Sequence, residues 1–277
     1  MNKIVDKEYF SDSVVKLVIE APEIAKSRKA GHFIIIRVDA KGERIPLTIV
    51  EADKENGTIT IIVQAMGVSS MKLVDLEVGD YITDVVGPLG NATHIENVGT
   101  VLASGGGVGV APLLPIVKAF KNAGNKVITV LAARTKELII LEEQIREFSD
   151  EVIIMTDDGS FGKKGLVTHG MEEIIKREKI DLAVTVGPAI MMKFVALLTK
   201  KYNIHTLASL NTIMVDGTGM CGACRVTVDG KTRFVCVDGP EFDAHKVDFD
   251  EMLSRLGAYK KQEEKAYEDY LSKYRKA

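Results

Sequence analysis

Residues 100–122 read TVLASGGGVGVAPLLPIVKAFKN, and this stretch decides the fold of the central part of the chain. Small and β-branched residues predict a strand over residues 100–104, which leads through a glycine-rich loop into a helix over residues 111–122. Pro112 suits the first helical turn, where its missing N–H group is not needed. Strand, glycine loop and helix in this order predict a βαβ unit.

The glycine loop has the features of a phosphate-binding turn. Its glycines permit close approach of a pyrophosphate, and the helix that follows offers unpaired N–H groups and the positive end of its dipole. The loop departs from the strict G-x-G-x-x-G fingerprint, so a tight turn without a ligand stays an alternative. Its position between a strand and a helix favours a nucleotide site.

Alternating strands and helices continue to about residue 207 and predict a parallel sheet. The further elements are expected at residues 126–132, 138–148, 152–156, 171–178 and 182–186. In such sheets ligands bind beyond the carboxyl ends of the strands. The loop over residues 156–162 (TDDGSFG) and the Gly187-Pro188 turn each follow a strand, so we expect them to meet the glycine loop at one pocket.

Two acids in this region bear on nucleotide choice. Asp157 or Asp158 can bond a ribose hydroxyl and would repel a 2′-phosphate, because the phosphate is itself an anion. This favours NAD over NADP. Solvated turn acids are the alternative interpretation, since Asp is a common turn residue.

The first ninety or so residues predict β structure. Short runs rich in β-branched residues are separated by Gly, Asp and Asn turns, and their regular spacing suggests a small antiparallel barrel. The strands are expected at residues 14–19, 33–38, 47–52 and 58–64, with a short helix over residues 69–76. The motifs RIPLT (residues 44–48) and GVSS (residues 67–70) together suit a flavin ring and its pyrophosphate, although each alone is typical of a surface turn.

The three cysteines of the chain form the most specific motif. Asp216, Cys221, Cys224 and Cys236 follow the spacing D-x4-C-x2-C-x11-C, and a plant-type [2Fe–2S] loop uses C-x4-C-x2-C with a distant fourth Cys. Asp216 stands at the first position. Ferric iron accepts thiolates and, less commonly, a carboxylate oxygen, so these four residues can complete a ligand set. Structural zinc held by Cys3Asp and free thiols are the alternatives, but zinc sites normally use paired C-x2-C knuckles or His.

Composition places the chain among ordinary globular proteins. It has 277 residues, 46% hydrophobic and 27% charged, with 36 basic and 39 acidic side chains and a net charge of -3. No apolar run spans a bilayer and the start lacks a signal-peptide core, so we expect a cytoplasmic protein that binds neither nucleic acid nor membrane.

The C-terminal tail is charged and helical in pattern. Its apolar and aromatic residues fall near one face, which favours docking to a partner over a solvated surface helix. They are Met252, Leu256, Tyr259, Tyr267, Tyr270, Leu271 and Tyr274.

In this order, the motifs resemble the ferredoxin–NADP reductase-like flavoprotein family. They include R-x-P-x-T, GVSS before a helix, GPLG at residues 87–90, the glycine loop followed by Ala-Pro, TDDGSFG, Gly-Pro and the late cysteine loop. Within that family the chain resembles the electron-transfer subunits of dihydroorotate dehydrogenase and, more closely, the small subunits of NADH-dependent reduced ferredoxin:NADP oxidoreductases, also described as sulfide dehydrogenases. The resemblance covers nearly the whole chain.

The resemblance implies a β plus α/β fold in four parts. Their expected bounds are residues 1–95 for an antiparallel FAD-binding barrel, 96–207 for a parallel-sheet NAD-binding domain, 208–246 for a small [2Fe–2S] domain and 247–277 for a helical tail.

The resemblance also implies the cofactor contacts. Arg44 would lie near the flavin phosphates. The residues along or beside the isoalloxazine would be Pro46, Leu47, Thr48, Val63 and Gln64, and those at the flavin pyrophosphate would be Gly67, Ser69 and Ser70. NAD(H) would use Gly106, Gly107, Val108, Arg134, Asp157 and Gly187. We assign no acid–base catalyst, because the cofactors carry hydride and electron chemistry.

The implied function is that of an NAD(H)-linked flavoprotein oxidoreductase subunit. It would exchange hydride with NAD(H) and pass electrons through the cluster to a larger flavin and iron–sulfur subunit, in a heterodimer or larger assembly that performs electron bifurcation. Because the dihydroorotate subunits normally have Cys where Asp216 stands, the ferredoxin-linked complex is favoured. The dihydroorotate dehydrogenase subunit and a zinc-stabilised dinucleotide sensor are the alternatives.

Overall fold

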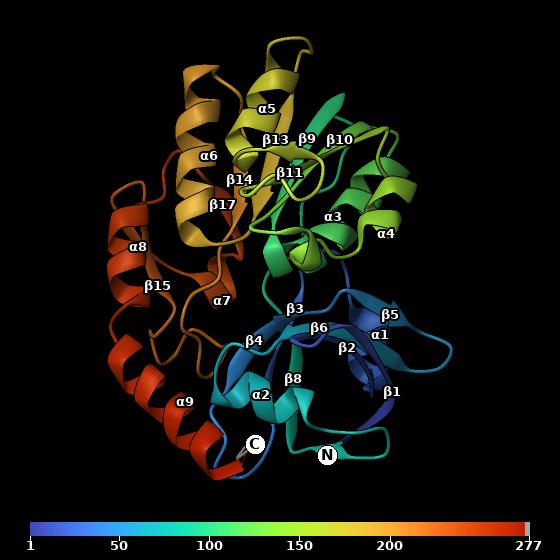
Figure 1. The fold of residues 1–277 in the computed structure, drawn as a ribbon, viewed down its shortest axis with the longest axis vertical. Helices are drawn as coiled ribbons and strands as arrows, with labels where there is room; N and C mark the ends of the chain where they lie inside the picture. Colours follow the sequence, from blue (N-terminus) through green and yellow to red (C-terminus); the bar gives the residue numbers. More distant parts are fainter. Residues whose placement is uncertain (275–277) are drawn as a thin grey trace.

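In the computed structural model, which describes residues 1–274, an antiparallel barrel and a mostly parallel sheet lie end to end, and a cysteine-bearing unit packs along their common side (Figure 1). The predicted fold class is therefore confirmed. Residues 275–277 of the predicted tail lie outside the described residues. Every helix within residues 1–274 is too short or too polar to cross a membrane.

Two antiparallel sheets form the barrel and share one core. Their strand orders are β5-β6-β2-β1-β7 and β4-β3-β8. Leu17, Ile19, Ile59 and Ile61 from the first sheet and Ile34 from the second are fully buried against each other. The elements are β1 Asn2–Ser11, β2 Val14–Glu20, α1 Pro22–Ser27, β3 Phe33–Arg37, β4 Ile45–Thr48, β5 Glu51–Asp53, β6 Thr58–Gln64, α2 Val68–Val74, β7 Tyr81–Ile82 and β8 Asp84–Leu89.

The chain changes sheets at Ile49 and Val50, so the prediction of one strand over residues 47–52 is wrong. The Ile49 N–H donates to the His32 carbonyl, whereas the Val50 N–H donates to the Thr60 carbonyl in the other sheet. The Arg28 guanidinium donates to the carbonyls of both residues. These bonds satisfy the backbone where it leaves one ladder and joins the next. Strand β1 was not predicted, because its charged residues mask the pattern.

A seven-stranded sheet follows, with order β12-β11-β10-β9-β13-β14-β17. All neighbours pair in parallel except β17, which is antiparallel to β14. The strands are β9 Thr100–Gly106, β10 Lys126–Ala133, β11 Glu151–Thr156, β12 Lys163–Lys164, β13 Leu182–Val186, β14 Thr206–Ser209 and β17 Glu241–Asp243. The parallel sheet predicted from the strand–helix rhythm is confirmed.

Helices cover both faces of this sheet. Val101 and Ala103 of β9 pack with α3 and α4, whereas Leu102 between them packs with α5 and α6. The helices are α3 Val110–Asn122, α4 Glu142–Glu147, α5 Val167–Ile175 and α6 Ala189–Lys201. The helix predicted over residues 138–148 is shorter than expected, because Leu141 takes a left-handed conformation at φ 57°. Helix α6 was not predicted.

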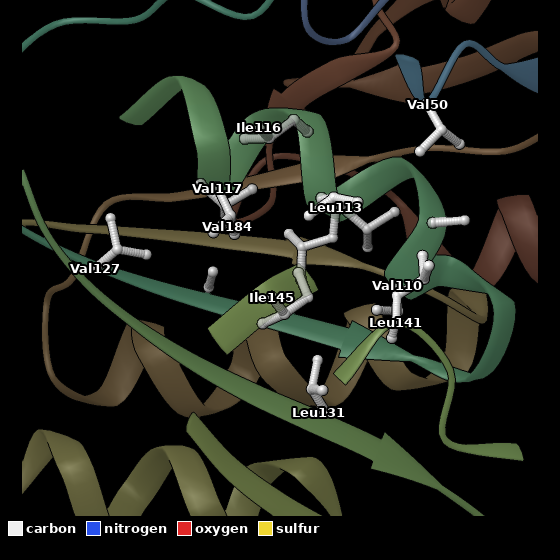
Figure 2. Close-up of a cluster of buried hydrophobic side chains, with 14 of the residues drawn as sticks. Val50, Val110, Leu113, Ile116, Val117, Val127, Leu131, Leu141, Ile145 and Val184 are labelled. Carbon is white, nitrogen blue, oxygen red and sulfur yellow. The ribbon is translucent and has the colours of Figure 1, made fainter. Parts of the chain in front are cut away.

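Helix α3 packs the sheet against the barrel. Figure 2 shows Val50, from the barrel, at the edge of a cluster that includes Val110 and Leu113 of α3 and Val184 of the sheet. All four are buried. One continuous hydrophobic core therefore sets how the barrel sits against the glycine loop that precedes α3.

The cysteine-bearing unit closes the side of the molecule. Its core joins Phe33 and Ile35 of the barrel to Met192 of α6, together with Cys224 and Cys236. Its elements are β15 Arg225–Val228, β16 Lys231–Phe234, α7 Val235–Asp238, α8 Phe249–Leu256 and α9 Lys260–Tyr274.

The tail forms two helices and does not present one continuous face. Met252 on α8 is buried in the core of the cysteine-bearing unit, whereas Tyr259 and Tyr274 are exposed. Helix α9 runs alongside the barrel (Figure 1), and the Tyr270 hydroxyl donates to Asp75 at the end of α2. The tail therefore ties the cysteine-bearing unit to the barrel.

Substitution of Gly109 tests the close packing behind the glycine loop. A Cβ on Gly109 would lie 2.7 Å from both Gly187 Cα and the Val186 carbonyl oxygen, and these backbone atoms cannot rotate away. We expect Gly109→Ala to lower the free energy of unfolding by about 1–3 kcal/mol, measured by denaturant titration. Gly257→Ala is the matched control, because its φ is -81° and its nearest neighbour lies at 3.6 Å. Equal stability of the two variants would contradict this account.

Candidate cofactor site

The glycine loop begins where β9 ends at Gly106. Residues Gly107–Gly109 form a short 3-10 turn that leads directly into α3. Gly107 has φ +54°, and an added Cβ would meet nothing within 4 Å, so its outer side is open. The inner side is closed, because Gly106 packs on Met191 and Gly109 packs on Gly187. The loop therefore presents open backbone on one side, which suits close approach of a phosphate group.

The loops after neighbouring strands meet at this same edge. The Asp157 N–H donates to the Ala133 carbonyl over 3.1 Å, and the Asp158 N–H donates to the Arg134 carbonyl over 3.3 Å. Gly187, which follows β13, contacts the glycine loop directly. The structure thus brings together the predicted nucleotide residues from four strands, which are Gly106, Gly107, Val108, Arg134, Asp157 and Gly187.

The two acids have different surroundings. The Asp158 carboxylate accepts hydrogen bonds from the Ser160 hydroxyl and N–H group, and these bonds hold the pKa of Asp158 below its usual range. The Ser160 hydroxyl in turn accepts from the Lys136 N–H group. Asp157 is exposed, and its carboxylate has no hydrogen-bonding partner within residues 1–274. Of the pair, Asp157 is the acid free to meet a ligand.

The predicted flavin residues of the barrel lie on two contacting strands. Pro46, Leu47 and Thr48 belong to β4, at the edge of the three-stranded sheet, where Thr48 pairs with Phe33. Val63 and Gln64 end β6, which contacts β4. An edge strand leaves one side of its backbone unpaired, so β4 can receive the edge of a ring.

Arg44 precedes β4 and is held only loosely. Its Nη2 atom lies 3.4 Å from Asp84 Oδ2, whereas Arg37 Nε donates to the same oxygen over 2.7 Å. The Arg37 hydrogen bond is the main reason that the pKa of Asp84 is lowered. Arg44 can therefore turn toward a phosphate while Arg37 still neutralises Asp84. No local motif in the sequence links Asp84, on β8, to Arg44.

The start of α2 carries the predicted pyrophosphate residues. Gly67 precedes the helix, and an added Cβ there would meet nothing within 4 Å. The Ser70 hydroxyl accepts from the N–H groups of Met66 and Gly67, so it caps its own turn. Ser69 is buried, and its hydroxyl lies 3.4 Å from a Glu43 carboxylate oxygen. Open space and first-turn N–H groups fit a phosphate, but the Ser70 hydroxyl is already engaged.

The four predicted metal ligands lie on one loop and one short helix. Cys224 and Cys236 are buried, with their Sγ atoms 3.2 Å apart, and Cys221 is exposed. The Asp216 carboxylate accepts from the N–H groups of Thr218 and Cys221. These bonds, led by that of Thr218, hold the pKa of Asp216 below its usual range, so its carboxylate is ionised at neutral pH.

The donor set can be divided between the two irons of an iron–sulfur cluster. Among the described residues, no three His, Cys, Asp or Glu side chains form one metal-binding group. The donors divide into the Cys224–Cys236 pair and a loop segment that carries Asp216 and Cys221. A two-iron cluster takes two protein ligands on each iron, which matches this division. Two sulfurs on one tetrahedral metal stand roughly 3.7 Å apart for bonds of about 2.3 Å, so the pair needs only a small adjustment.

The cluster loop packs directly on the barrel. Gly217 has φ +74°, and a Cβ there would lie 2.5 Å from Leu89 and 3.1 Å from Ile35. Ile35 belongs to β3, which pairs with β4. The predicted ligand loop is therefore one strand away from the predicted flavin strand.

Comparison with protein families divides the chain into three matched parts. Residues 2–94 match the oxidoreductase FAD-binding domain, residues 104–197 match the oxidoreductase NAD-binding domain, and residues 211–248 match the iron–sulfur cluster binding domain of dihydroorotate dehydrogenase B.

Two curated relatives cover most of the chain. The dihydroorotate dehydrogenase B (NAD(+)), electron transfer subunit homolog of Thermotoga maritima is 49% identical over 271 residues, 98% of this chain and 96% of that protein. The dihydroorotate dehydrogenase B (NAD(+)), electron transfer subunit of Streptococcus pneumoniae strain R6 is 33% identical over 250 residues, 87% of this chain and 94% of that protein.

Solved structures share the fold. A chain from a structure described as giving insights into flavin-based electron bifurcation, that of NADH-dependent reduced ferredoxin-NADP oxidoreductase, is 48% identical with a TM-score of 0.93 and covers 98% of both chains. The Amycolatopsis cytochrome P450 reductase GcoB is 16% identical with a TM-score of 0.62 over 74% of this chain and 68% of that one, which shows a shared fold alone.

The cysteines should differ in reactivity once metal is removed. Burial is the main cause that raises the pKa of Cys236 to about 12, and Cys224 is also buried, whereas Cys221 is exposed. In chelator-treated, reduced protein at pH 8, we expect iodoacetamide to modify Cys221 about tenfold faster than the other two, followed by mass spectrometry. Cys221→Ser should remove the fast phase. Equal labelling of all three cysteines in folded protein would contradict the geometry.

Proposed function

This chain belongs to the ferredoxin–NADP reductase-like flavoprotein family that includes the electron-transfer subunits of dihydroorotate dehydrogenase B, and from that premise we propose that it works in a bifurcating NADH-dependent ferredoxin:NADP+ oxidoreductase. As a family member it is an NAD(H)-linked flavoprotein oxidoreductase that binds FAD, NAD(H) and an iron–sulfur cluster. In the proposed role it exchanges hydride with NAD(H) and passes electrons to a larger flavin and iron–sulfur subunit.

Asp216 is the observation that carries this proposal. It stands at the first position of the predicted ligand motif, its carboxylate accepts a hydrogen bond from the Cys221 N–H group, and the backbone bonds from Thr218 and Cys221 lower its pKa. The 48% identity and full-length overlap with a chain of the ferredoxin-NADP oxidoreductase structure support the same assignment.

The residues of this chain would each hold one part of the electron path. In our proposal the barrel, residues 1–95, holds FAD through Arg44, the β4 edge and the start of α2. The sheet, residues 96–207, holds NAD(H) through the glycine loop, Arg134, Asp157 and Gly187. Residues 208–246 hold the cluster through Asp216, Cys221, Cys224 and Cys236, and residues 247–277 form the tail.

The cofactors supply the chemistry when bound, since nicotinamide and flavin exchange a hydride and an iron–sulfur cluster takes one electron at a time. The protein supplies position. The hydrophobic cluster around Val50 and Leu113 sets the barrel against the dinucleotide site, and Gly217 lets the ligand loop lie on β3. Both contacts bring cofactor-holding loops close together, which hydride and electron transfer require.

An exposed apolar surface beside the cluster loop suits the larger subunit. Met220 is 89% exposed, and Val215 and Val237 on the same unit are 46% and 41% exposed. Gly219, next to Met220, packs against Val237, so these side chains border the ligand loop. An exposed apolar group at this place favours a partner that buries the loop and shields the cluster from water.

The cytoplasmic location of the protein stays a prediction.

The dihydroorotate dehydrogenase electron-transfer subunit is the second candidate. Two of the relatives above, 49% and 33% identical, carry that description, and the cluster domain matches that of dihydroorotate dehydrogenase B. The two candidates differ in the partner. Affinity purification of this chain from the native cell identifies the partner. Recovery of a larger subunit that carries both flavin and iron–sulfur centres supports the ferredoxin-linked oxidoreductase. Recovery of a flavoprotein that oxidises dihydroorotate supports the dihydroorotate dehydrogenase.

A visible spectrum with metal analysis tests the proposed function. Anaerobically purified protein should show flavin and [2Fe–2S] absorption together, contain two irons per chain, and lose flavin absorbance on addition of NADH. NADPH serves as the matched nucleotide and should react more slowly. Colourless, iron-free protein or protein with zinc in place of iron would reject the proposal and favour the zinc-stabilised dinucleotide sensor.

Replacing Asp216 should change the cluster potential in a known direction. A carboxylate donates less electron density to iron than a thiolate, so reduction is easier with Asp216 than with Cys at that position. We expect the native potential to lie above the roughly -400 mV of plant-type ferredoxins, and Asp216→Cys to lower it. Redox titration followed by electron paramagnetic resonance measures both. A variant potential equal to or above the native one would show that Asp216 does not ligate iron.

A further inference from the structure

The segment from Val237 to Glu241 joins three parts of the molecule. On the barrel side, the Asn91 N–H donates to the Gly239 carbonyl over 2.7 Å, and the Asn91 side chain donates to the Val237 carbonyl over 3.0 Å. Val237 belongs to α7, the short helix that carries Cys236. The barrel is therefore bonded to the cluster-bearing helix through backbone that leads into Glu241.

On the other side, the same segment joins the dinucleotide-binding sheet. Glu241 begins β17 and pairs with Ser209 of β14. The Leu210 N–H donates to the Pro240 carbonyl over 2.9 Å, at the point where the chain leaves β14 for the cluster loop. A shift of Glu241 would thus move the sheet edge and the start of the cluster loop together.

The Glu241 side chain closes this junction onto the barrel. Its carboxylate accepts a hydrogen bond of 2.7 Å from the hydroxyl of Thr93, which is buried. The Thr93 N–H donates to the Ala30 carbonyl. Gly31 beside it has φ +85°, and an added Cβ would lie 2.5 Å from the Thr93 hydroxyl and 3.1 Å from the Glu241 carboxylate. Gly31 lies two residues before Phe33, the pairing partner of Thr48 on the predicted flavin strand.

We propose that Glu241 is a positioning residue for hydride transfer, because its hydrogen bond to Thr93 sets the flavin barrel against the dinucleotide-binding sheet. The inference rests on the proposed function and goes beyond it, since Glu241 lies outside all the predicted cofactor contacts. It acts through Thr93 and the backbone around Gly31.

Burial raises the pKa of Glu241 to about 7, and the Thr93 hydrogen bond opposes that change. Among residues 1–274, no electrostatic interaction with a neighbouring charged group contributes to the shift in the pKa of Glu241. The titratable groups nearby are engaged elsewhere. Asp243 on β17 pairs with Lys246, and Asp238 on α7 accepts from the backbone of Phe234. On the barrel side, burial together with the charges of Arg28 and Lys29 lowers the pKa of His32.

The sign of the pH effect follows from the raised pKa. The folded state binds the proton more tightly than the unfolded chain does, so the stability contributed by neutral Glu241 is fully present below about pH 4.5. It is lost as the pH rises through about 7, where the junction must hold a charge. Barrel and sheet should therefore be positioned best when Glu241 is neutral, and less well above pH 7.

Stopped-flow reduction of the holoprotein by NADH, from pH 5.5 to 9, tests this. We expect the rate constant for flavin reduction to fall several-fold with a midpoint near pH 7. Glu241→Gln, which keeps an acceptor oxygen without a charge, should give a flat profile near the low-pH rate. Thr93→Val removes the hydrogen bond that positions the barrel, so flavin reduction should be slower than in the native protein even at low pH. The same bond favours the charged form of Glu241, so the midpoint of Thr93→Val should also move to higher pH.

Glu55→Gln is the matched control, because Glu55 is exposed in a turn of the barrel, and it should keep the native profile. The pH dependence of the holoprotein's melting temperature is a second readout, and its decline between about pH 4.5 and 7 should be smaller in Glu241→Gln than in the native protein. A native midpoint retained in Glu241→Gln would overturn the inference, as would an unmoved midpoint in Thr93→Val.

The outcomes separate this inference from the proposed function. If Glu241→Gln does not fold, Thr93→Val decides alone. If NADH reduces the native flavin but the profile is flat, the positioning role of Glu241 is rejected and the proposed function stands. If NADH reduces no flavin at any pH, the proposed function itself fails, and the inference with it.

Discussion

Close packing of glycine backbone against neighbouring segments, with no room for a Cβ atom, is the constraint on which the cofactor-holding parts depend. Gly109 meets Gly187 where two strands of the sheet end, and Gly217 meets Leu89 and Ile35 where the cluster loop reaches the barrel. At each place a Cβ would overlap its neighbour. The loops can therefore approach to van der Waals contact, and the open outer side of Gly107 is left for a ligand.

The hydrophobic core turns these local contacts into one arrangement. Helix α3 is buried on the face that meets Val50 of the barrel and Val184 of the sheet, so the glycine loop before it is fixed relative to both. A second core joins Phe33 and Ile35 to the two buried cysteines. Burial of this kind contributes far more than the exposed ion pairs of the surface, such as Lys26–Glu23. The relative position of the three parts is thus mainly a property of apolar packing.

The sequence predicted those features that depend on local patterns. The glycine loop and the cysteine spacing each combine a residue type with a fixed interval. The parallel sheet followed from the alternation of strands and helices, and the barrel followed from short β-branched runs separated by turn residues. Features set by distant segments were missed. The change of sheet at Ile49 depends on Arg28, the α4 boundary depends on the left-handed Leu141, and the Arg44–Asp84 ion pair joins residues forty positions apart. The spacing of residues along the sequence does not indicate these contacts between distant positions.

Glu241 shows that a contact between distant segments, which no local sequence pattern predicts, can matter for function. In the sequence it is one acid among 39, with no motif around it. Its special position arises only when β17 adds to the sheet as an antiparallel edge and Thr93 returns from the barrel. A carboxyl placed where three cofactor-holding parts meet is costly to ionise, because burial penalises its charge. The protein retains it there in contact with a hydroxyl, so protonation can alter the junction without altering any cofactor ligand.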